Sequence, residues 1–158
     1  MRHRLAIVAL SLTGLAVAVP STATSQQTLD PTTRILVAAA QKARSTAATG
    51  RLKLEVTRIP ASSNQAVAIA KLVRGELGTL EDVVVCTGAP AACKLKGADV
   101  FVRLAQPTVV GDTASVPVSL WQQTENAAQP IQRGDLEIQV VRHGLSWVVS
   151  GMRVKSQS

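Results

Sequence analysis

Two cysteines are the residues whose type and spacing point most directly to chemistry. Cys86 and Cys93 are the only cysteines of the chain, and the six residues between them, Thr-Gly-Ala-Pro-Ala-Ala, favour a turn. Such a pair can form a disulfide, act in redox exchange or hold a metal. Redox pairs normally have the spacing C-x-x-C, and a metal would need two further ligands. We therefore favour a structural disulfide and keep the redox and metal interpretations as alternatives.

No arrangement of residues predicts catalysis. The chain has no phosphate-binding glycine loop, no dinucleotide fingerprint, no metalloprotease motif and no nucleophile elbow. His143 is the one histidine beyond the N-terminal segment, and it falls in an expected turn. Glu81 and Asp82 are adjacent at an expected strand, where neighbouring side chains point to opposite faces. The sequence predicts no catalytic residue, no metal and no cofactor.

Aromatic side chains are scarce. Beyond Phe101, Trp121 and Trp147 there are none, and tyrosine is absent. Proteins that bind single-stranded nucleic acid or sugars stack flat ligands on exposed rings, so this shortage disfavours nucleic acid as a partner. The three aromatics either anchor the core where a sheet meets its helices or line a ligand pocket, and both interpretations stay open.

Basic residues are concentrated early in the chain. The formal net charge is +7, and Glu55 is the only acidic residue within 31–58. A basic surface of this kind either meets anionic lipids, glycans or nucleic acid, or keeps the domain soluble. The candidate residues for anionic-surface contact are Arg34, Lys42, Arg44, Arg51, Lys53 and Arg58.

The N-terminus has the pattern of a secretory signal peptide. A basic start is followed by an uncharged apolar run over residues 5–19, and Ser21-Thr22-Ala23 supplies the small residues that a signal peptidase recognises. The run is shorter than the roughly 20 residues that span a bilayer. We predict cleavage at or within a few residues of Ala23, and export to the periplasm or the outside of the cell. An uncleaved anchor is the alternative.

The rest of the chain shows helical and then strand periodicity. Asp30-Pro31 is typical of a helix start, and Gly50 is expected to lie beyond the helix end. A strand, a second helix and an antiparallel meander should follow, with a hairpin turn at Gly111-Asp112. The expected ranges are 51–57 and 81–86 for the first strands, 65–73 for the second helix, and 100–104, 114–120, 136–142 and 147–154 for the meander.

These elements predict a single α+β domain over residues 30–155, preceded by the signal peptide (1–23) and a disordered lead (24–29). The N-terminal helices are expected to pack on a curved antiparallel sheet of about four to six strands. Pro107 and Pro117 fall in expected strands, where a missing N–H interrupts the ladder, so we expect a bulge or an edge strand there.

The C-terminal half resembles small bacterial exported proteins of no assigned activity. The resemblance lies in Val100 to Leu104, Pro107 to Val116, residues 136–142 and Ser146 to Val149. It implies a nuclear transport factor 2-like, or cystatin-like, fold, in which helices lie against a curved antiparallel sheet and a pocket opens between them. Enzymes of that fold carry Asp, His or Tyr in the pocket. No inward strand position of this chain carries Asp or His and tyrosine is absent, so no catalytic residue is carried over.

Three functions are compatible with these features. The leading hypothesis is an exported, non-catalytic domain that binds a small apolar ligand or a protein partner in its sheet–helix cleft, with Phe101, Trp121 and Trp147 as candidate pocket residues. One alternative is a hydrolase or isomerase of the cone-shaped fold. The other is binding to an anionic surface through the basic residues of 31–58.

Overall fold

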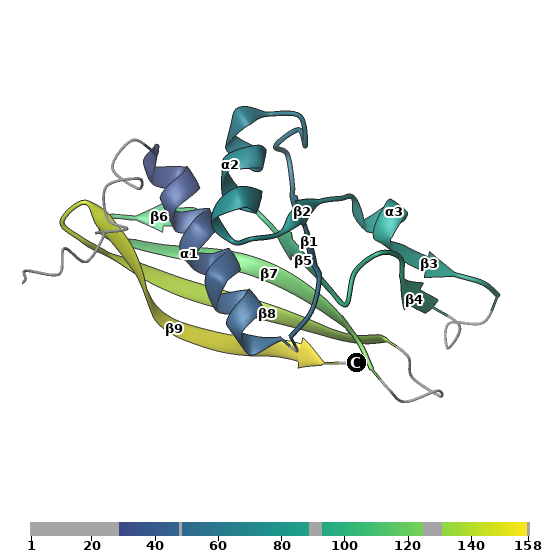
Figure 1. Ribbon diagram of the computed structural model, residues 1–158. Helices are drawn as coiled ribbons and strands as arrows, with labels where there is room; N and C mark the ends of the chain where they lie inside the picture. The colour runs from purple at the N-terminus through teal and green to yellow at the C-terminus, as the bar shows by residue number, and fades with distance from the viewer. Residues whose placement is uncertain (1–28, 48, 89–92, 125–130, 158) are drawn as a thin grey trace, which may run out of the picture.

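The computed structural model describes residues 29–47, 49–88, 93–124 and 131–157, so the expected signal peptide and nearly all of the expected lead lie outside it (Figure 1). The helices are α1 (Pro31–Thr46), α2 (Asn64–Leu72) and α3 (Leu80–Val83). The strands are β1 (Leu52–Val56), β2 (Glu76–Leu77), β3 (Val84–Cys86), β4 (Cys93–Leu95), β5 (Val100–Leu104), β6 (Thr108–Val110), β7 (Thr113–Gln123), β8 (Ile131–His143) and β9 (Ser146–Gln157).

The first helix, α1, begins at the Asp30-Pro31 pair, which confirms the sequence prediction. The Asp30 carboxylate accepts a hydrogen bond from the Thr33 backbone N–H at 3.0 Å and another from the Thr33 hydroxyl. Pro31 takes the first helical position, where a missing N–H leaves no helical hydrogen bond unmade. One side of α1 packs across β5, β7, β8 and β9 (Figure 1). The buried residues on that side include Ile35, Leu36, Ala39, Ala40 and Ala43.

The main sheet is mixed, which corrects the expectation of an antiparallel sheet of fewer strands. It has seven strands in the order β2-β1-β5-β7-β8-β9, with β6 paired to the first part of β7. Strand β1 runs parallel to both β2 and β5, and the remaining pairs are antiparallel. A parallel pair needs a crossover, and α2 supplies the one between β1 and β2. The alternation in 52–56 predicts a strand correctly, but it carries no information on the direction of the neighbouring strands.

Pro117 lies inside the long strand β7, which has no bulge at this position. The ladder is interrupted on the neighbouring side, where β5 ends and β6 begins. The Pro117 carbonyl accepts a hydrogen bond from the Ala105 N–H at 2.9 Å, so this side of β7 faces the break between β5 and β6. In an antiparallel strand the N–H and C=O of one residue point to the same side. The missing N–H of Pro117 therefore faces the break, and its pairing with β8 is continuous.

The sheet has a packed core on each face. The larger core lies between the sheet and the helices α1 and α2. The smaller one lies on the other face at one end, where Phe101 and Trp121 contact each other with ring centroids 5.4 Å apart. Val83 and Leu95, from α3 and β4, cover these two rings. The segment from α3 to β4 therefore belongs to the face of the sheet that α1 leaves open.

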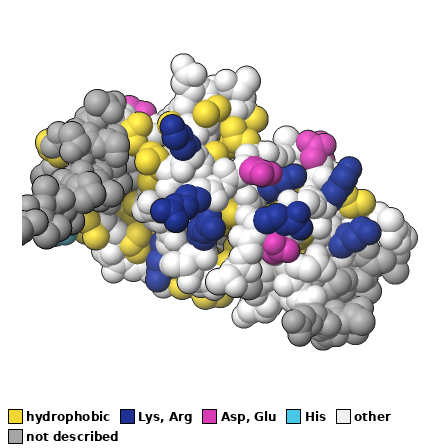
Figure 2. All heavy atoms as spheres, in the orientation of Figure 1, with side chains coloured by type: hydrophobic (Ala, Val, Ile, Leu, Met, Phe, Trp, Pro, Cys, Tyr) yellow, Lys and Arg dark blue, Asp and Glu magenta, His cyan; other side chains and the backbone are white. Residues whose placement is uncertain are grey.

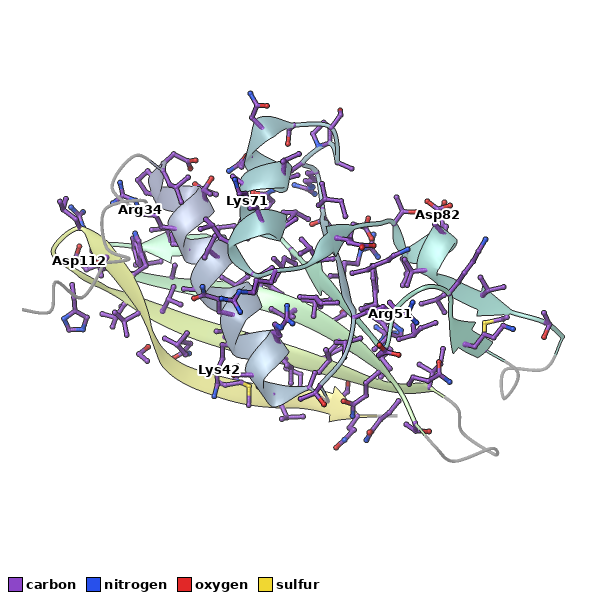
Figure 3. All side chains as sticks on the ribbon, in the orientation of Figure 1. Arg34, Lys42, Arg51, Lys71, Asp82 and Asp112 are labelled. Atoms are coloured by element: carbon purple, nitrogen blue, oxygen red, sulfur yellow. A yellow bond between two sulfur atoms is a disulfide. The ribbon has the colours of Figure 1, made fainter. Side chains whose placement is uncertain are left out.

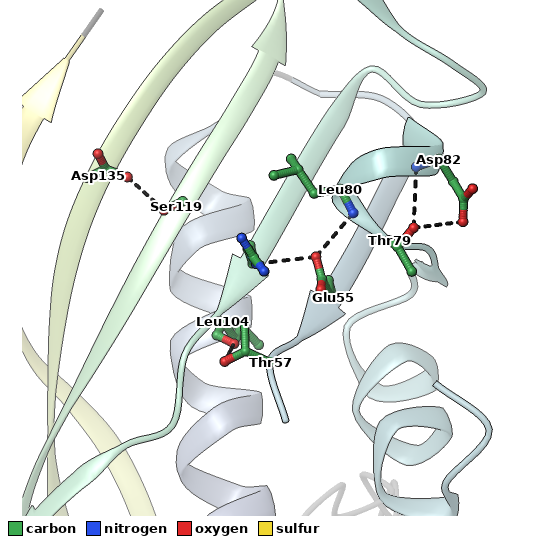
Figure 4. Close-up of polar contacts among 9 residues, drawn as sticks. Glu55, Thr57, Thr79, Leu80, Asp82, Leu104, Ser119 and Asp135 are labelled. Carbon is green, nitrogen blue, oxygen red and sulfur yellow. Dashed lines mark hydrogen bonds and ion pairs between the residues drawn. The ribbon is translucent and has the colours of Figure 1, made fainter. Parts of the chain in front are cut away.

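Residues 80–86 form α3 followed by β3, which corrects the expectation of one strand over 81–86. The Thr79 hydroxyl accepts a hydrogen bond from the Asp82 N–H at 3.3 Å and donates to the Asp82 carboxylate at 2.7 Å, which caps the short helix (Figure 4). The Glu55 carboxylate accepts a hydrogen bond from the Leu80 N–H at 3.1 Å. This bond ties the start of α3 to β1.

The expected disulfide is present. Strands β3 and β4 form an antiparallel ribbon in which Cys86 lies directly opposite Cys93, with Cα atoms 3.9 Å apart. Within the described ranges, no three His, Cys, Asp or Glu side chains gather as metal ligands would. The bond closes the outer end of the ribbon, away from both sheet cores.

Candidate functional site

A cleft opens between the C-terminal ends of α1 and α2 and the start of β1, and we call it the α1–α2 cleft. Its volume is about 460 Å³, which is within the range of small-molecule sites. Leu52, Leu72 and Val100 contribute apolar surface to it. The other lining residues are Gln41, Arg44, Ser45, Ala47, Thr49, Gly50, Val73 and Arg74.

Arg44 joins the two helices at this cleft. Its Nη1 atom donates to the backbone carbonyls of Val73 and Arg74, the latter at 2.7 Å. These carbonyls belong to the end of α2, where helical partners are lacking and where a cation is favourable. Arg44 therefore fixes the distance between α1 and α2 and brings one positive charge to the cleft.

Arg74 brings a second positive charge and has a strained backbone. The α2 helix ends with two capping bonds, from the Gly75 N–H to the Ala70 carbonyl at 2.9 Å and from the Arg74 N–H to the Lys71 carbonyl at 3.2 Å. This arrangement is a Schellman motif, whose left-handed position normally holds glycine. Here that position is Arg74, with φ of 54°. An unfavourable backbone at the mouth of a cleft is the kind of feature that functional sites retain.

The glycine at this helix end is Gly75, one residue after the left-handed position, and its packing against β1 explains that placement. A Cβ atom on Gly75 would lie 3.0 Å from side-chain atoms of both Leu52 and Leu54. The close approach of α2 to β1 therefore favours glycine at 75, and the left-handed position before it is occupied by an arginine. The same packing holds Arg74 at the edge of the α1–α2 cleft.

The residues that line the α1–α2 cleft offer hydrogen-bond donors, positive charge and apolar surface. They comprise two arginines, hydroxyls, one amide and aliphatic side chains, without a carboxylate, imidazole or thiol among them. Arginine presents several N–H donors in a planar fork that matches a carboxylate or a phosphate. The arrangement suits a ligand with an apolar body and an anionic group.

The three aromatic residues predicted as pocket candidates do not come together. Phe101 and Trp121 are buried in the smaller core, with exposures of 0% and 8%. Trp147, on β9, lies on the other face of the sheet and lines an open groove of about 330 Å³ against Lys42 and Ala38 of α1. The core interpretation therefore holds for Phe101 and Trp121, and only Trp147 borders a cavity.

The basic residues of 31–58 lie at several separate places. Figure 3 shows Arg34 near the start of α1, Lys42 towards its end, and Arg51 beyond it near β1. Lys53 alternates with buried Leu52 and Leu54, and so lies on the other face of the sheet from the helices. Lysine and arginine side chains on the helix face form separate groups, with acidic side chains among some of them (Figure 2). The six residues are Arg34, Lys42, Arg44, Arg51, Lys53 and Arg58, and Arg44 is the one that lines the α1–α2 cleft.

A ladder of polar side chains on the open face of the sheet is not evident from motif analysis. Five consecutive strands place Glu55, Arg103, Ser119, Asp135 and Ser156 side by side. The Ser119 hydroxyl donates to Asp135 at 2.7 Å (Figure 4). The Ser156 hydroxyl donates to the same carboxylate at 2.9 Å, and Arg103 lies 3.3 Å from Glu55. The sequence signal for this ladder is the alternation of Asp135, Glu137 and Gln139 with apolar residues in β8.

Two carboxylates of this face, Asp135 and Glu137, are held ionised. Hydrogen bonds from Ser115, Arg153 and Lys155 lower the pKa of Glu137 to about 2. The Ser119 hydroxyl, with smaller contributions from Ser156 and Arg133, lowers the pKa of Asp135. A general acid needs the opposite shift, towards neutral pH. The two carboxylates therefore act as acceptors that link β7, β8 and β9.

None of the helices in the described ranges is long and apolar enough to cross a bilayer. Comparison of the chain with protein-family models, curated proteins and solved structures finds no match. The function must therefore be inferred from the chemistry of the α1–α2 cleft and of the surfaces around it.

Proposed function

We propose that this protein is an exported, non-catalytic binding domain, and that its α1–α2 cleft takes a small, largely apolar molecule with one anionic group. The observation that carries the proposal is the pairing of an apolar wall with two arginines in one cleft. Leu52, Leu72 and Val100 offer the apolar surface, and Arg44 and Arg74 offer the positive charge.

The position of each arginine supports a division of roles. Arg44 is already bonded through Nη1 to two carbonyls, so its guanidinium is held in place before a ligand arrives. Pre-organised donors lose little entropy on binding. The Arg74 side chain makes no hydrogen bond or ion pair with another residue in the described part of the chain, and it can turn towards the anionic group. The apolar body then lies along Leu72 and Val100.

Export and fold are parts of the same proposal. The Cys86–Cys93 disulfide favours an oxidising compartment, and the N-terminal pattern favours removal of residues 1–23. We place the fold as a variant of the nuclear transport factor 2-like cone, because α1 and α2 cover one face of a sheet whose strands from β5 to β9 are antiparallel. The parallel strands β1 and β2 depart from that pattern.

The test compares two ligands that differ in the sign of their charge. Decanoate and decyltrimethylammonium have apolar chains of the same length, and their binding can be measured by isothermal titration calorimetry. We expect decanoate to bind more tightly, and Arg74→Ala to remove most of that preference. Arg58→Ala is the matched control, because Arg58 is also an exposed arginine with a left-handed backbone but lies outside the α1–α2 cleft.

A second variant tests the location without changing charge. Ser45 is exposed on α1 and lines the cleft, so Ser45→Trp should fill it while α1 stays folded. We expect loss of decanoate binding with little change in melting temperature. Equal binding of the two ligands, or decanoate binding that survives both Arg74→Ala and Ser45→Trp, would exclude this cleft as the site. If a folded protein binds at the cleft and Ser45→Trp blocks that binding, the ligand of the cleft is a protein partner and the proposal of a small ligand is wrong.

A further inference from the structure

A second cavity lies at the edge of β1, where the neighbouring strand β2 ends. Strand β2 pairs with Lys53 and Leu54, and within the described residues no strand continues it along the rest of β1. The Gly78 N–H donates to the Leu54 carbonyl at 3.0 Å, and the chain then turns away into α3. The space between β1, the loop after it and the first turn of α2 has a volume of about 340 Å³. We call it the β1-edge cavity, and it shares no lining residue with the α1–α2 cleft.

The wall of the β1-edge cavity is aliphatic. Leu54 and Val56 of β1 are buried beside it, and Ile59 and Leu77 contribute half-buried side chains. No ring of phenylalanine or tryptophan is among the residues that line it. Its volume is at the lower end of the range for small-molecule sites. The cavity therefore suits a compact molecule with a short aliphatic group.

Glu55 brings a negative charge to this cavity and is held in place. Its Oε2 atom accepts a hydrogen bond from the Leu80 N–H at 3.1 Å (Figure 4) and lies 3.3 Å from Nε of Arg103. The other oxygen, Oε1, accepts no hydrogen bond from any residue in the described part of the chain. The half-buried Glu55 carboxylate therefore keeps one acceptor for a ligand, in a position that two neighbours already fix.

Arg58 brings a positive charge to the same cavity from a strained turn. The Ile59 N–H donates to the Val56 carbonyl at 3.2 Å, which places Arg58 at the third position of the turn with φ of 63°, where glycine is usual. Among the described residues other than glycine, only Arg58 and Arg74 have a positive φ, and each lines a cavity. The exposed Arg58 side chain forms no hydrogen bond or ion pair with another described residue, Glu55 included. The cavity thus holds two opposite charges that do not neutralise each other.

We propose that the β1-edge cavity binds a free α-amino acid with an aliphatic side chain, such as leucine. An α-amino acid at neutral pH carries an ammonium and a carboxylate on one carbon atom, which matches the unpaired opposite charges of Glu55 and Arg58. The ammonium donates to Glu55 Oε1, the carboxylate accepts from the Arg58 guanidinium, and the side chain lies against Leu54 and Leu77. A purely anionic molecule meets the Glu55 carboxylate instead, so this cavity and the α1–α2 cleft should select different ligands. The proposal is independent of the ligand of that cleft.

The test compares three ligands that share one isobutyl group. Leucine carries both charges, leucinamide lacks the carboxylate, and isocaproate lacks the ammonium. Binding to protein from the exported fraction is measured by proton–nitrogen NMR, which also identifies the backbone amides that respond. We expect leucine to bind about tenfold more tightly than either analogue, because one hydrogen bond between charged groups contributes about that much. The signals of Ala61 and Gly78 should shift, and that of Gly50, in the α1–α2 cleft, should not.

Two variants test the residues. Arg58→Ala should weaken leucine binding about tenfold and leave leucinamide binding unchanged, because leucinamide has no carboxylate for Arg58 to bind. Ala61→Phe, at an exposed position that lines the cavity, should abolish leucine binding, and Ser62→Phe, at the next exposed position outside it, should not. Melting temperatures establish that each variant is folded.

Four results would each overturn the proposal. Leucine and leucinamide bind equally well, or Arg58→Ala weakens both by the same factor. Leucine binding survives Ala61→Phe, which would place the site elsewhere. The signals of Ala61 and Gly78 stay unchanged at leucine concentrations near the limit of its solubility.

Discussion

Arg74 holds the left-handed backbone position at the end of α2, while Gly75, the residue that tolerates that conformation best, lies one position later against β1. An exchange of the two residues is unfavourable, because a side chain at 75 would press on the side chains of Leu52 and Leu54. The helix end thus combines tight packing with a strained arginine at the α1–α2 cleft. Replacement of Arg74 by glycine should therefore have opposite effects on the stability of the fold and on ligand binding.

Arg74→Gly should raise the free energy of unfolding by about 0.5–1 kcal/mol, because relief of the left-handed strain outweighs the added freedom of the unfolded chain. The same variant should weaken decanoate binding, because it removes a positive charge from the α1–α2 cleft. Urea denaturation and calorimetry measure the two effects. Arg58→Gly, at φ of 63°, should give a similar gain in stability without the loss of binding. A more stable Arg74→Gly variant with unchanged affinity would count against a ligand role for Arg74.

Gly75→Ala should destabilise the protein by about 1–3 kcal/mol, because the new methyl group forces leucine side chains of β1 to shift. Gly134→Ala is the control, since the nearest atom to its Cβ would be the Ser156 carbonyl oxygen at 3.9 Å. Thermal unfolding of the two variants should separate them clearly. Equal melting temperatures would show that α2 can move away from β1 at little cost.

Stability at acid pH should depend on Glu137. Its pKa in the folded protein is about 2, below the ordinary value of 4.5, because Ser115, Arg153 and Lys155 bond to the ionised form. The ionised group therefore stabilises the fold above pH 4.5, and this contribution is lost as the pH falls towards 2. Glu137→Gln should lower the melting temperature at neutral pH and make it fall less steeply between these values. Glu81→Gln, which removes one exposed carboxylate from α3, is the matched control.

Replacement of both Cys86 and Cys93 by serine should lower the free energy of unfolding by about 2–3 kcal/mol, because the bond restricts a short loop in the unfolded chain. Decanoate binding should persist, because the ribbon lies on the other face of the sheet from the α1–α2 cleft. Mass spectrometry after alkylation without reductant tests the bond directly in protein from the exported fraction. Two alkylated thiols in most molecules would reopen the redox and metal interpretations.

Local signals predicted the local structure well. Asp30-Pro31 marks the start of α1, and the predicted second helix, 65–73, lies within one residue of α2 at each end. The spacing of Cys86 and Cys93 predicted their bond, because the turn-forming residues between them allow the chain to reverse. In each case the residues that make the contact are neighbours in the sequence.

Features that depend on distant partners were missed. The parallel pairing of β1 with β5 joins segments whose own patterns are compatible with either direction. The left-handed backbone of Arg74 follows from the contact of Gly75 with β1, and the sequence around residue 74 does not predict that conformation. Trp121 was a candidate for both core and pocket because the segment that covers it, from α3 to β4, has no strong periodicity of its own.

The position of β1 between β2 and β5 determines the order in which the strands of the main sheet can pair. Hairpins such as β8–β9 form between neighbouring segments, whereas β1 cannot pair with β5 until residues 57–99 are also available. Contacts of long sequence separation form slowly. If the chain crosses a membrane from its N-terminus, as we propose, α1 and β1 emerge first and find no sheet to join. The domain would then remain unfolded until its last strands arrive, which is the state that a translocation channel requires of its cargo.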